Sequence, residues 1–317
     1  MTRTLGSSGI SVSTVGVGCN AFGTRIDEAQ TKAVVDACFE HGVNFFDTAD
    51  GYGDSEVLLG KALAGRRGDV VIATKFGRDL QGRNGDDGGR RGRAAYVRTA
   101  IEASLTRLGT DHVDLYQLHT PDPGTPIEET LGAMNELVVE GKVRAIGGCN
   151  LQAWQMVDAD WVSKTKGYAS FVTAQNEFSL YNRTAETELV PACVELGVGI
   201  LPYFPLAYGL LTGKYRRGEA APEGTRLAVQ RQRLDDANWD TIEALETFAE
   251  MRGISILELA IGGLAAQPAV ASVIAGATKP EQIAANAAAG EWTPAAEDLQ
   301  ELAAIGKPEH SYTTYAK

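Results

Sequence analysis

Eight short apolar segments alternate with helical patterns along nearly the whole chain, and this alternation restricts the possible folds more than any other feature of the sequence. The strand-like segments are residues 14–18, 44–48, 70–75, 112–119, 143–150, 171–175, 198–203 and 271–275. The helical patterns are residues 27–41, 55–63, 96–108, 127–140, 151–163, 185–196, 240–252 and 280–289. Several strand-like segments are nearly continuous apolar runs, which is typical of parallel strands covered on both faces. The alternation therefore predicts an α/β fold of the (β/α)8 TIM-barrel type.

The same pattern predicts the domain organisation. A doubly wound parallel sheet is the main alternative, but it usually carries a GxGxxG turn after its first strand. Gly16, Gly18 and Gly23 do not have that spacing. No linker interrupts the alternation, so we expect residues 1–317 to form a single domain. The glycine-rich segment 77–93, which has no apolar periodicity, is predicted to be a long loop after the third strand, and residues 205–232 are predicted to be a second long insertion after the seventh.

The charge balance and the cysteine content exclude several classes of protein. The chain has 29 basic and 41 acidic residues, a formal net charge of −12, which argues against binding to nucleic acid or to an anionic membrane surface. No apolar run approaches the ~20 residues of a membrane span, and the N-terminus has no signal-peptide pattern. The four cysteines form no CxxC pair, so we expect reduced thiols, no metal site and a cytoplasmic location.

Polar side chains stand at the ends of three consecutive predicted strands. Asp47 lies at the end of the second strand, Lys75 ends the third and His119 ends the fourth. Tyr52 follows Asp47 by five residues. In a (β/α)8 barrel the active site lies at the C-terminal ends of the strands, so these four side chains are expected to meet at one mouth.

The four residue types suit proton transfer to a developing alkoxide. The ordinary pKa of tyrosine, ~10, is too high for efficient acid–base catalysis at neutral pH, and a nearby ammonium lowers that pKa. A buried carboxylate keeps a lysine charged, and a histidine can orient a carbonyl oxygen. An alkoxide forms when a hydride is delivered to a carbonyl carbon. The set therefore predicts carbonyl reduction without a metal or a covalent nucleophile.

Structural roles are the alternatives for several polar residues. Lys75 could simply neutralise Asp47 inside the barrel, a role that is compatible with catalysis. Asp50 and Asp54 are predicted to be turn and cap residues. The arginines of the first long loop are predicted to be solvated, with contact to a phosphate as the alternative for one of them. These arginines are at positions 78, 83, 90, 91 and 93.

Four segments resemble the sequence signature of the aldo-keto reductase superfamily. The longest is Asn-Phe-Phe-Asp-Thr-Ala-Asp-Gly-Tyr-Gly-Asp-Ser-Glu at 44–56, and the others are 73–76, 109–119 and 200–206. The resemblance extends from about residue 5 to residue 289. It implies a (β/α)8 barrel, the cofactor NADPH with NADH as the alternative, and a catalytic set that maps onto Asp47, Tyr52, Lys75 and His119.

The resemblance also implies where the cofactor binds. It places the nicotinamide carboxamide at Cys149, Asn150 and Gln175, with the ring stacked on Tyr203. The pyrophosphate loop is 205–213, and the adenine end lies along 276–286. Within these two segments the implied contacts are Pro205, Leu206, Gly209, Leu211, Gly213, Gly276, Lys279, Gln282 and Asn286. The family usually has serine at the position of Cys149, and Gln282 replaces an arginine frequent in NADPH-specific members. Lys279 is therefore the cation expected to meet a 2′-phosphate.

The leading hypothesis is an NAD(P)H-dependent reductase that transfers a hydride to an aldehyde or ketone, reversibly, with a tyrosine as general acid. The expected partner is a small-molecule carbonyl substrate, and the expected assembly is a monomer or a weak homo-oligomer. A second hypothesis is a nicotinamide-binding regulatory subunit, because relatives of the family accompany ion channels. A third is a Schiff-base enzyme with Lys75 as nucleophile. The substrate stays open among aldehydes, ketosteroids, keto sugars and pyridoxal-like compounds.

Overall fold

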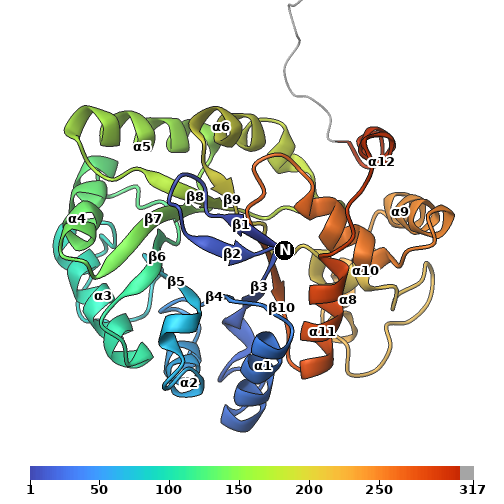
Figure 1. The fold of residues 1–317 in the computed structure, drawn as a ribbon, viewed down its shortest axis with the longest axis horizontal. Helices are drawn as coiled ribbons and strands as arrows, with labels where there is room; N and C mark the ends of the chain where they lie inside the picture. The colour runs from blue at the N-terminus through green and yellow to red at the C-terminus, as the bar shows by residue number, and fades with distance from the viewer. Residues whose placement is uncertain (308–317) are drawn as a thin grey trace, which may run out of the picture.

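A computed structural model describes residues 1–307, and its central feature is one sheet of eight parallel strands (Figure 1). The strands are β3 (Val15–Gly18), β4 (Phe45–Asp47), β5 (Val71–Phe76), β6 (Val113–Leu118), β7 (Val143–Cys149), β8 (Phe171–Gln175), β9 (Gly199–Ile200) and β10 (Val273–Gly276). Their order in the sheet is β10-β3-β4-β5-β6-β7-β8-β9. Parallel bridges from Ile200 to Val270 and from Tyr203 to Ile274 join the two edges. The predicted barrel is confirmed.

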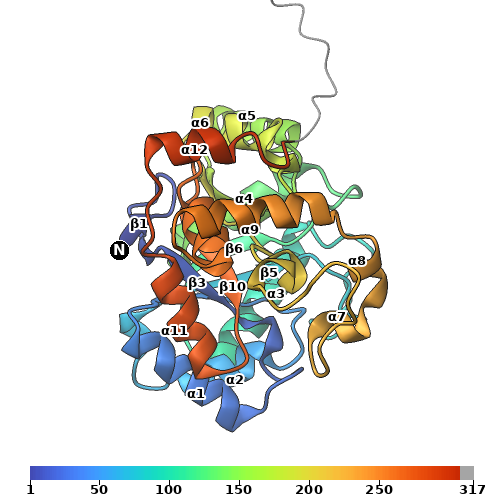
Figure 2. The ribbon, with the colours of Figure 1, turned by 90° about the vertical axis from the view of Figure 1, so that its right-hand side faces the viewer.

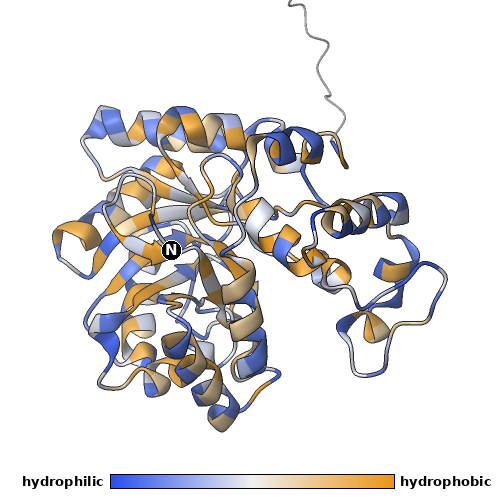
Figure 3. Ribbon diagram, turned by 45° about the vertical axis from the view of Figure 1, so that its right-hand side comes forward, coloured by the Kyte–Doolittle hydropathy of each residue, from blue (hydrophilic) through white to orange (hydrophobic). Residues whose placement is uncertain are grey.

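Helices lie between consecutive strands and surround the sheet (Figures 1 and 2). The predicted helices are α1 (Glu28–Glu40), α2 (Ser55–Ala62), α3 (Ala94–Leu108), α4 (Ile127–Val139), α5 (Ala153–Lys166), α6 (Leu189–Leu196), α9 (Trp239–Met251) and α11 (Pro280–Ala289). The sequence also forms α10 (Ile256–Glu258), which continues as a π-helical turn (Leu259–Gly263), and α12 (Ala296–Leu302). Apolar and polar residues alternate along these helices, which gives each an apolar and a polar side (Figure 3). Within residues 1–307, no helix is long and apolar enough to cross a membrane.

Local signals explain where individual helices begin and end. The Asp27 carboxylate accepts a 2.9 Å hydrogen bond from the Gln30 backbone amide, and the Gln30 side chain accepts one from the Asp27 amide at 3.1 Å. This reciprocal pair caps the N-terminus of α1. Gly109 ends α3 in the left-handed region, with φ of 64°, where glycine has no steric penalty. These caps define where α1 begins and where α3 ends.

An N-terminal hairpin that the sequence pattern did not indicate covers one end of the barrel. Its strands, β1 (Thr2–Thr4) and β2 (Ser11–Ser13), have three residues each and mixed polarity, too short for a periodic signal. Leu5 and Val12 are fully buried and belong to the same apolar cluster as Phe45 and Leu115 of the barrel. Figure 1 shows the hairpin across the middle of the sheet. It closes the end of the barrel opposite the site described below.

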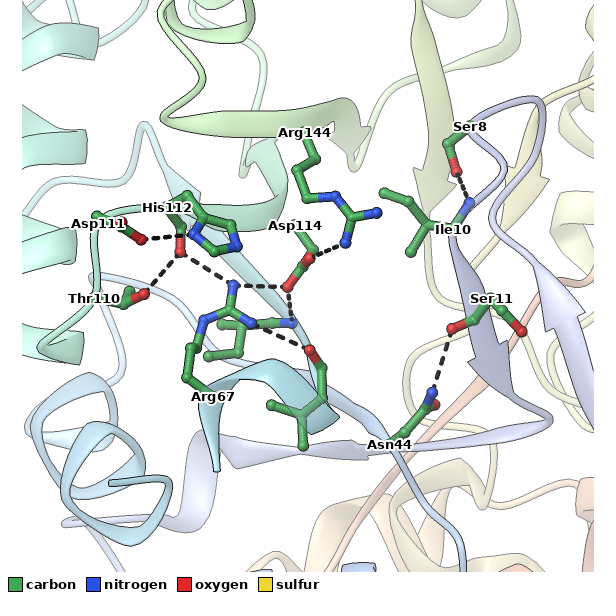
Figure 4. Close-up of polar contacts among 12 residues, drawn as sticks. Ser8, Ile10, Ser11, Asn44, Arg67, Thr110, Asp111, His112, Asp114 and Arg144 are labelled. Carbon is green, nitrogen blue, oxygen red and sulfur yellow. Dashed lines mark hydrogen bonds and ion pairs between the residues drawn. The ribbon is translucent and has the colours of Figure 1, made fainter. Parts of the chain in front are cut away.

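Buried charge also stabilises that N-terminal end of the strands. Asp114, at the start of β6, is 1% exposed and accepts hydrogen bonds from Arg67 at 2.8 Å and Arg144 at 2.6 Å (Figure 4). Its Oδ2 also accepts a 2.9 Å bond from the backbone amide of Ile72 in β5. Because Arg144 lies in β7, one carboxylate links three neighbouring strands. Polar groups at this end of a barrel serve stability.

The two predicted long connections differ in structure. Residues 77–93, here called the β5–α3 loop, contain no helix or strand. Residues 205–232 contain a short 3₁₀ segment (Ala207–Thr212), α7 (Arg226–Val229) and the start of α8 (Arg231–Asp235). Buried Leu211, Tyr215 and Leu227 anchor the second connection in an apolar cluster that it shares with α9 and α12. The long connection predicted after the seventh strand is therefore present, and it contains short helical segments.

Candidate active site

The barrel contains a buried ion pair between Asp47 at the end of β4 and Lys75 in β5. The Lys75 ammonium donates to Asp47 Oδ2 at 2.6 Å and to the Thr48 carbonyl at 2.9 Å. Asp47 is 3% exposed and Lys75 is fully buried. Burial alone would lower the pKa of Lys75, but the charges of Asp47, Tyr52 and Cys149 raise that pKa above its ordinary value. Lys75 is therefore a fixed, permanently charged ammonium.

Two glutamines complete the hydrogen bonding of the Asp47 carboxylate. The Gln175 side chain, from the end of β8, donates to Asp47 Oδ1 at 2.8 Å. The Gln117 side chain, from β6, approaches the same oxygen at 3.4 Å. The sequence analysis did not predict Gln117 as a site residue, because it lies inside an apolar strand, one position before the last residue of β6. The carboxylate is thus held from three sides.

Tyr52 lies on the connection between β4 and α2, next to this ion pair. The Lys75 ammonium is 5.1 Å from the centroid of the Tyr52 ring. Burial raises the pKa of Tyr52, the charge of Lys75 lowers it and Asp47 raises it, and the net direction is upward. The ammonium is therefore the group that favours a phenolate at this position.

His119 follows β6 and faces Tyr52 with its ring edge-on. The two ring centroids are 5.6 Å apart and the ring planes meet at 83°. Burial, with the charges of Lys75 and Arg78, lowers the pKa of His119 to about 2. Its Nδ1 is buried and has no hydrogen-bond partner among residues 1–307. His119 is consequently a neutral imidazole that offers one N–H and one lone pair.

A cavity of about 740 Å³ opens at the C-terminal ends of the strands above these residues. Of the predicted site residues, those lining it are Asp47, Tyr52, His119, Asn150, Gln175, Tyr203, Pro205, Leu206, Gly209, Gly276, Lys279 and Gln282. Those outside its lining are Lys75, Cys149, Leu211, Gly213 and Asn286. Lys75 is fully buried beneath Asp47 and Tyr52, Cys149 is 1% exposed, and Leu211 packs in the apolar cluster that the 205–232 connection shares with α9. The cavity thus gathers most of the predicted residues at one mouth.

Asn150 connects two walls of the cavity. Its backbone is in the left-handed region, with φ of 58°, a conformation that asparagine tolerates better than most residues. Its side-chain amide donates to the His119 carbonyl at 2.8 Å, and its oxygen accepts from the Tyr203 hydroxyl at 2.8 Å. Burial, with the charge of Glu177, raises the pKa of Tyr203 to about 12. The Tyr203 ring is therefore a neutral, fixed wall of the cavity.

Five cations also line the cavity; the sequence analysis expected a ligand at Lys279 and left phosphate contact open for one arginine of the β5–α3 loop. The five are Arg25, Arg78, Lys214, Arg226 and Lys279. None of them has an ion-pair partner within the described part of the chain, whereas the single lining carboxylate, Asp47, is already paired with Lys75. A concentration of unpaired cations in a protein of net charge −12 favours an anionic ligand. Sequence spacing could not reveal this because the cations come from four separate connections.

Comparison with known proteins agrees with the fold. The Aldo/keto reductase family model matches residues 14–307. The chain belongs to the aldo/keto reductase family, and the resemblance seen in its motifs is confirmed.

Several relatives cover nearly all of the chain. A probable voltage-gated potassium channel subunit beta of Arabidopsis thaliana is 35% identical over 306 residues, which span 92% of each chain. The uncharacterized oxidoreductase YrpG of Bacillus subtilis (strain 168) is 35% identical over 289 residues, or 88% of this chain and 87% of the relative. A probable aldo-keto reductase 1 of Glycine max is 35% identical over 309 residues, or 94% and 86%. The family match, together with the oxidoreductase and aldo-keto reductase names of two of these relatives, shows that this chain is an oxidoreductase.

Proposed function

We propose that this protein is an NAD(P)H-dependent reductase that converts an aldehyde or ketone to the corresponding alcohol, in a reversible reaction. The observation that carries the proposal is the placement of Tyr52 between a charged Lys75 and a neutral His119 at the mouth of the barrel. A protonated phenol beside an ammonium is suited to give its proton to a developing alkoxide.

The residues of the cavity fit a nicotinamide cofactor, which supplies a hydride when it is bound. The unpaired cations Lys214, Arg226 and Lys279 offer charge for phosphate groups. A Cβ added at Gly276 would meet no atom nearer than 4.0 Å, so glycine leaves space there for a ligand. Asn150 and Gln175 would hold the carboxamide, with Tyr203 against the ring.

The connection after β9 and the start of α11 would bind the rest of the cofactor. Pro205, Leu206 and Gly209 line the cavity beside Lys214 and would contact the diphosphate. Lys279 precedes α11, and Gln282 already accepts a 2.7 Å bond from the Thr278 amide. The helix N-terminus and the Lys279 ammonium would both favour a 2′-phosphate, which makes NADPH the preferred cofactor.

Side chains of the protein would then transfer a proton to the substrate oxygen. Tyr52 donates its phenolic proton to the substrate oxygen, and the charge of Lys75 stabilises the phenolate that remains. Asp47 keeps Lys75 charged and in place, so Asp47 acts through the lysine. His119, being neutral, has one N–H with which it can orient the carbonyl oxygen. Proton transfer of this kind contributes about 10²–10⁴-fold to the rate.

The direct test is the Tyr52→Phe variant, assayed by NADPH oxidation with a reactive aldehyde. We expect kcat to fall by about 10²–10⁴-fold, while NADPH binding, measured by fluorescence titration, is retained because the proposed cofactor contacts come from other strands. A Tyr52→Phe variant with near-native kcat would remove Tyr52 from the mechanism and overturn the proposal.

A regulatory role is the second candidate, because the Arabidopsis relative is named as a probable channel subunit beta. That role requires cofactor binding with little turnover. Measuring NADPH binding and aldehyde reduction on the same preparation separates the two. A Schiff base on Lys75 is disfavoured, since a nucleophilic amine needs a lowered pKa and Asp47 holds the pKa of Lys75 high. Borohydride trapping of substrate on Lys75 would reverse that judgement.

A further inference from the structure

Arg78 occupies a position beside the proposed reaction centre. It follows Gly77 at the beginning of the β5–α3 loop and lines the cavity. A Cβ built on Gly51 would lie 3.9 Å from the Arg78 Cβ and 3.7 Å from its Cδ, so the arginine stem passes next to the residue before Tyr52. A Cβ built on Gly77 would lie 3.8 Å from the His119 backbone nitrogen. Arg78 therefore stands between the segments that carry Tyr52 and His119.

Arg78 has no ion pair within its loop, because the carboxylates near it pair with other arginines. The carboxylate nearest in sequence, Asp79, pairs with Arg91 at 3.1 Å, and Asp87 pairs with the same arginine at 2.7 Å. Arg83 pairs with Asp54 at 3.2 Å. Among residues 1–307, Arg78 has neither an ion pair nor a side-chain hydrogen bond. An arginine that faces a cavity while its neighbours take the available carboxylates is free to bind an anion from outside.

Arg78 lies on the side of the barrel mouth where the substrate is proposed to bind. The proposed cofactor contacts follow β7, β8, β9 and β10, whereas Arg78 follows β5, between β4 and β6 in the sheet. Arg25 differs, because burial and the charge of Arg226 both lower its pKa, which associates Arg25 with the connection after β9. Arg78 is thus the cavity cation adjacent to Tyr52 and His119, on a connection that carries none of the proposed cofactor contacts.

We propose that Arg78 determines substrate specificity by binding an anionic group, so that the preferred substrates are aldehydes or ketones carrying a carboxylate or a phosphate. The inference rests on the proposed reductase function and names its substrate class. The guanidinium fork pairs with both oxygens of such a group, while the carbonyl oxygen lies at Tyr52 and His119. The unpaired charge of Arg78 would be satisfied by the substrate.

The test compares anionic substrates with neutral analogues that keep the same aldehyde. The pairs are 4-carboxybenzaldehyde with its methyl ester, and glyceraldehyde 3-phosphate with glyceraldehyde. The proteins are the native chain, Arg78→Gln, Arg78→Lys and the control Arg83→Gln, which removes an arginine of the same loop that lies outside the cavity lining. The readout is kcat/KM with NADPH, expressed as the charged-to-neutral ratio for each pair.

We expect the native protein to have a higher kcat/KM for the charged member of at least one pair. The pair with the larger charged-to-neutral ratio shows whether a carboxylate or a phosphate is favoured. Arg78→Gln should lower that ratio by about 10–100-fold, the scale of a charge-assisted hydrogen bond, mainly through KM. Arg78→Lys should restore part of the ratio, and Arg83→Gln should leave it unchanged. A native ratio at or below one in both pairs, or equal losses in Arg78→Gln and Arg83→Gln, would overturn the inference.

Failure of the reductase proposal gives a different result. In that case the native protein reduces neither member of either pair. Binding of 4-(hydroxymethyl)benzoate to the native chain and to Arg78→Gln in the presence of NADP⁺, measured by calorimetry, still tests Arg78 without turnover. Binding at least tenfold weaker in Arg78→Gln supports the anion site, and equal binding refutes it.

Discussion

The Gln175 side chain donates a 2.8 Å hydrogen bond to Asp47 Oδ1, while the Lys75 ammonium donates to Oδ2 at 2.6 Å. Gln175 comes from β8 and Asp47 from β4, so the contact crosses the barrel. A residue proposed to bind the nicotinamide therefore also positions the carboxylate that holds Lys75. This hydrogen bond therefore connects the proposed cofactor-binding residues with the proposed catalytic residues.

Gln175→Met removes the amide while keeping the side chain's length. Asp47 Oδ1 then keeps only the 3.4 Å contact with Gln117, and the lost bond to a charged group is worth about 1.5–3 kcal/mol. We expect kcat to fall by roughly tenfold or more, together with weaker cofactor binding. Steady-state kinetics and a cofactor titration measure the two effects. Weaker binding with an unchanged kcat would limit Gln175 to cofactor binding.

Lys279 and Lys214 form a matched pair for testing cofactor preference. Both ammonium groups line the cavity, but Lys279 precedes α11, where the 2′-phosphate is proposed, and Lys214 lies beside the proposed diphosphate site. Lys279→Ala should narrow the affinity gap between NADPH and NADH by about 1–2 kcal/mol. Lys214→Ala should weaken both cofactors alike, because both carry the diphosphate. Fluorescence titration of the two variants with both cofactors measures these affinities. Equal affinities of the native protein for NADPH and NADH would contradict the proposed role of Lys279.

His119 should not titrate near neutral pH. Burial and two nearby cations lower its pKa from 6.5 to about 2. The neutral form therefore persists in the folded protein, and the associated stability is present above pH 6.5 and lost as pH falls toward 2. We expect the His119 ring signals in NMR to stay constant from pH 5 to pH 9, with assignment from a His119→Gln spectrum. A titration step near pH 6.5 would contradict the neutral imidazole and its role in orienting the carbonyl.

The sequence predicted those features that depend on order along the chain. Alternating segments specify the barrel, and the barrel places strand ends together, so Asp47, Lys75 and His119 were found from their positions alone. Gln117 was missed because a single polar residue inside an apolar strand resembles a chance interruption. Its role depends on which side of β6 faces the barrel interior.

Features set by loop direction could not be predicted. Arg78 and Arg83 lie five residues apart in the same loop, yet one lines the cavity and the other pairs with Asp54. Composition gives no reason to separate them. Asp50 lies in a turn as predicted, but its burial to 1% exposure was not foreseen, because it depends on contacts such as that with Asn84 of the β5–α3 loop.

The buried Asp50 carboxyl predicts a pH-dependent stability. Asn84 donates a 2.9 Å hydrogen bond to Asp50 Oδ2, and Oδ1 has no partner among residues 1–307. Burial and the charge of Glu56 raise the pKa of Asp50 to about 7, although Arg107 and Asn84 act in the opposite direction. Since the folded pKa exceeds the unfolded value of 3.8, the stability it contributes is fully present below pH 3.8 and is lost as pH rises through 7.

Asp50→Asn isolates this effect, because the amide oxygen can still accept from Asn84 while the group no longer ionises. Between pH 5 and pH 8 the native protein should lose about 2–3 kcal/mol through Asp50. The advantage of the variant over the native protein in free energy of unfolding should therefore grow by about 2–3 kcal/mol between pH 5 and pH 8. Urea denaturation at both pH values measures the difference. The same stability change at pH 5 and pH 8 would show that the Asp50 carboxyl of the folded protein is already ionised at pH 5, and Asp50 would then be an ordinary carboxylate that accepts a hydrogen bond from the β5–α3 loop.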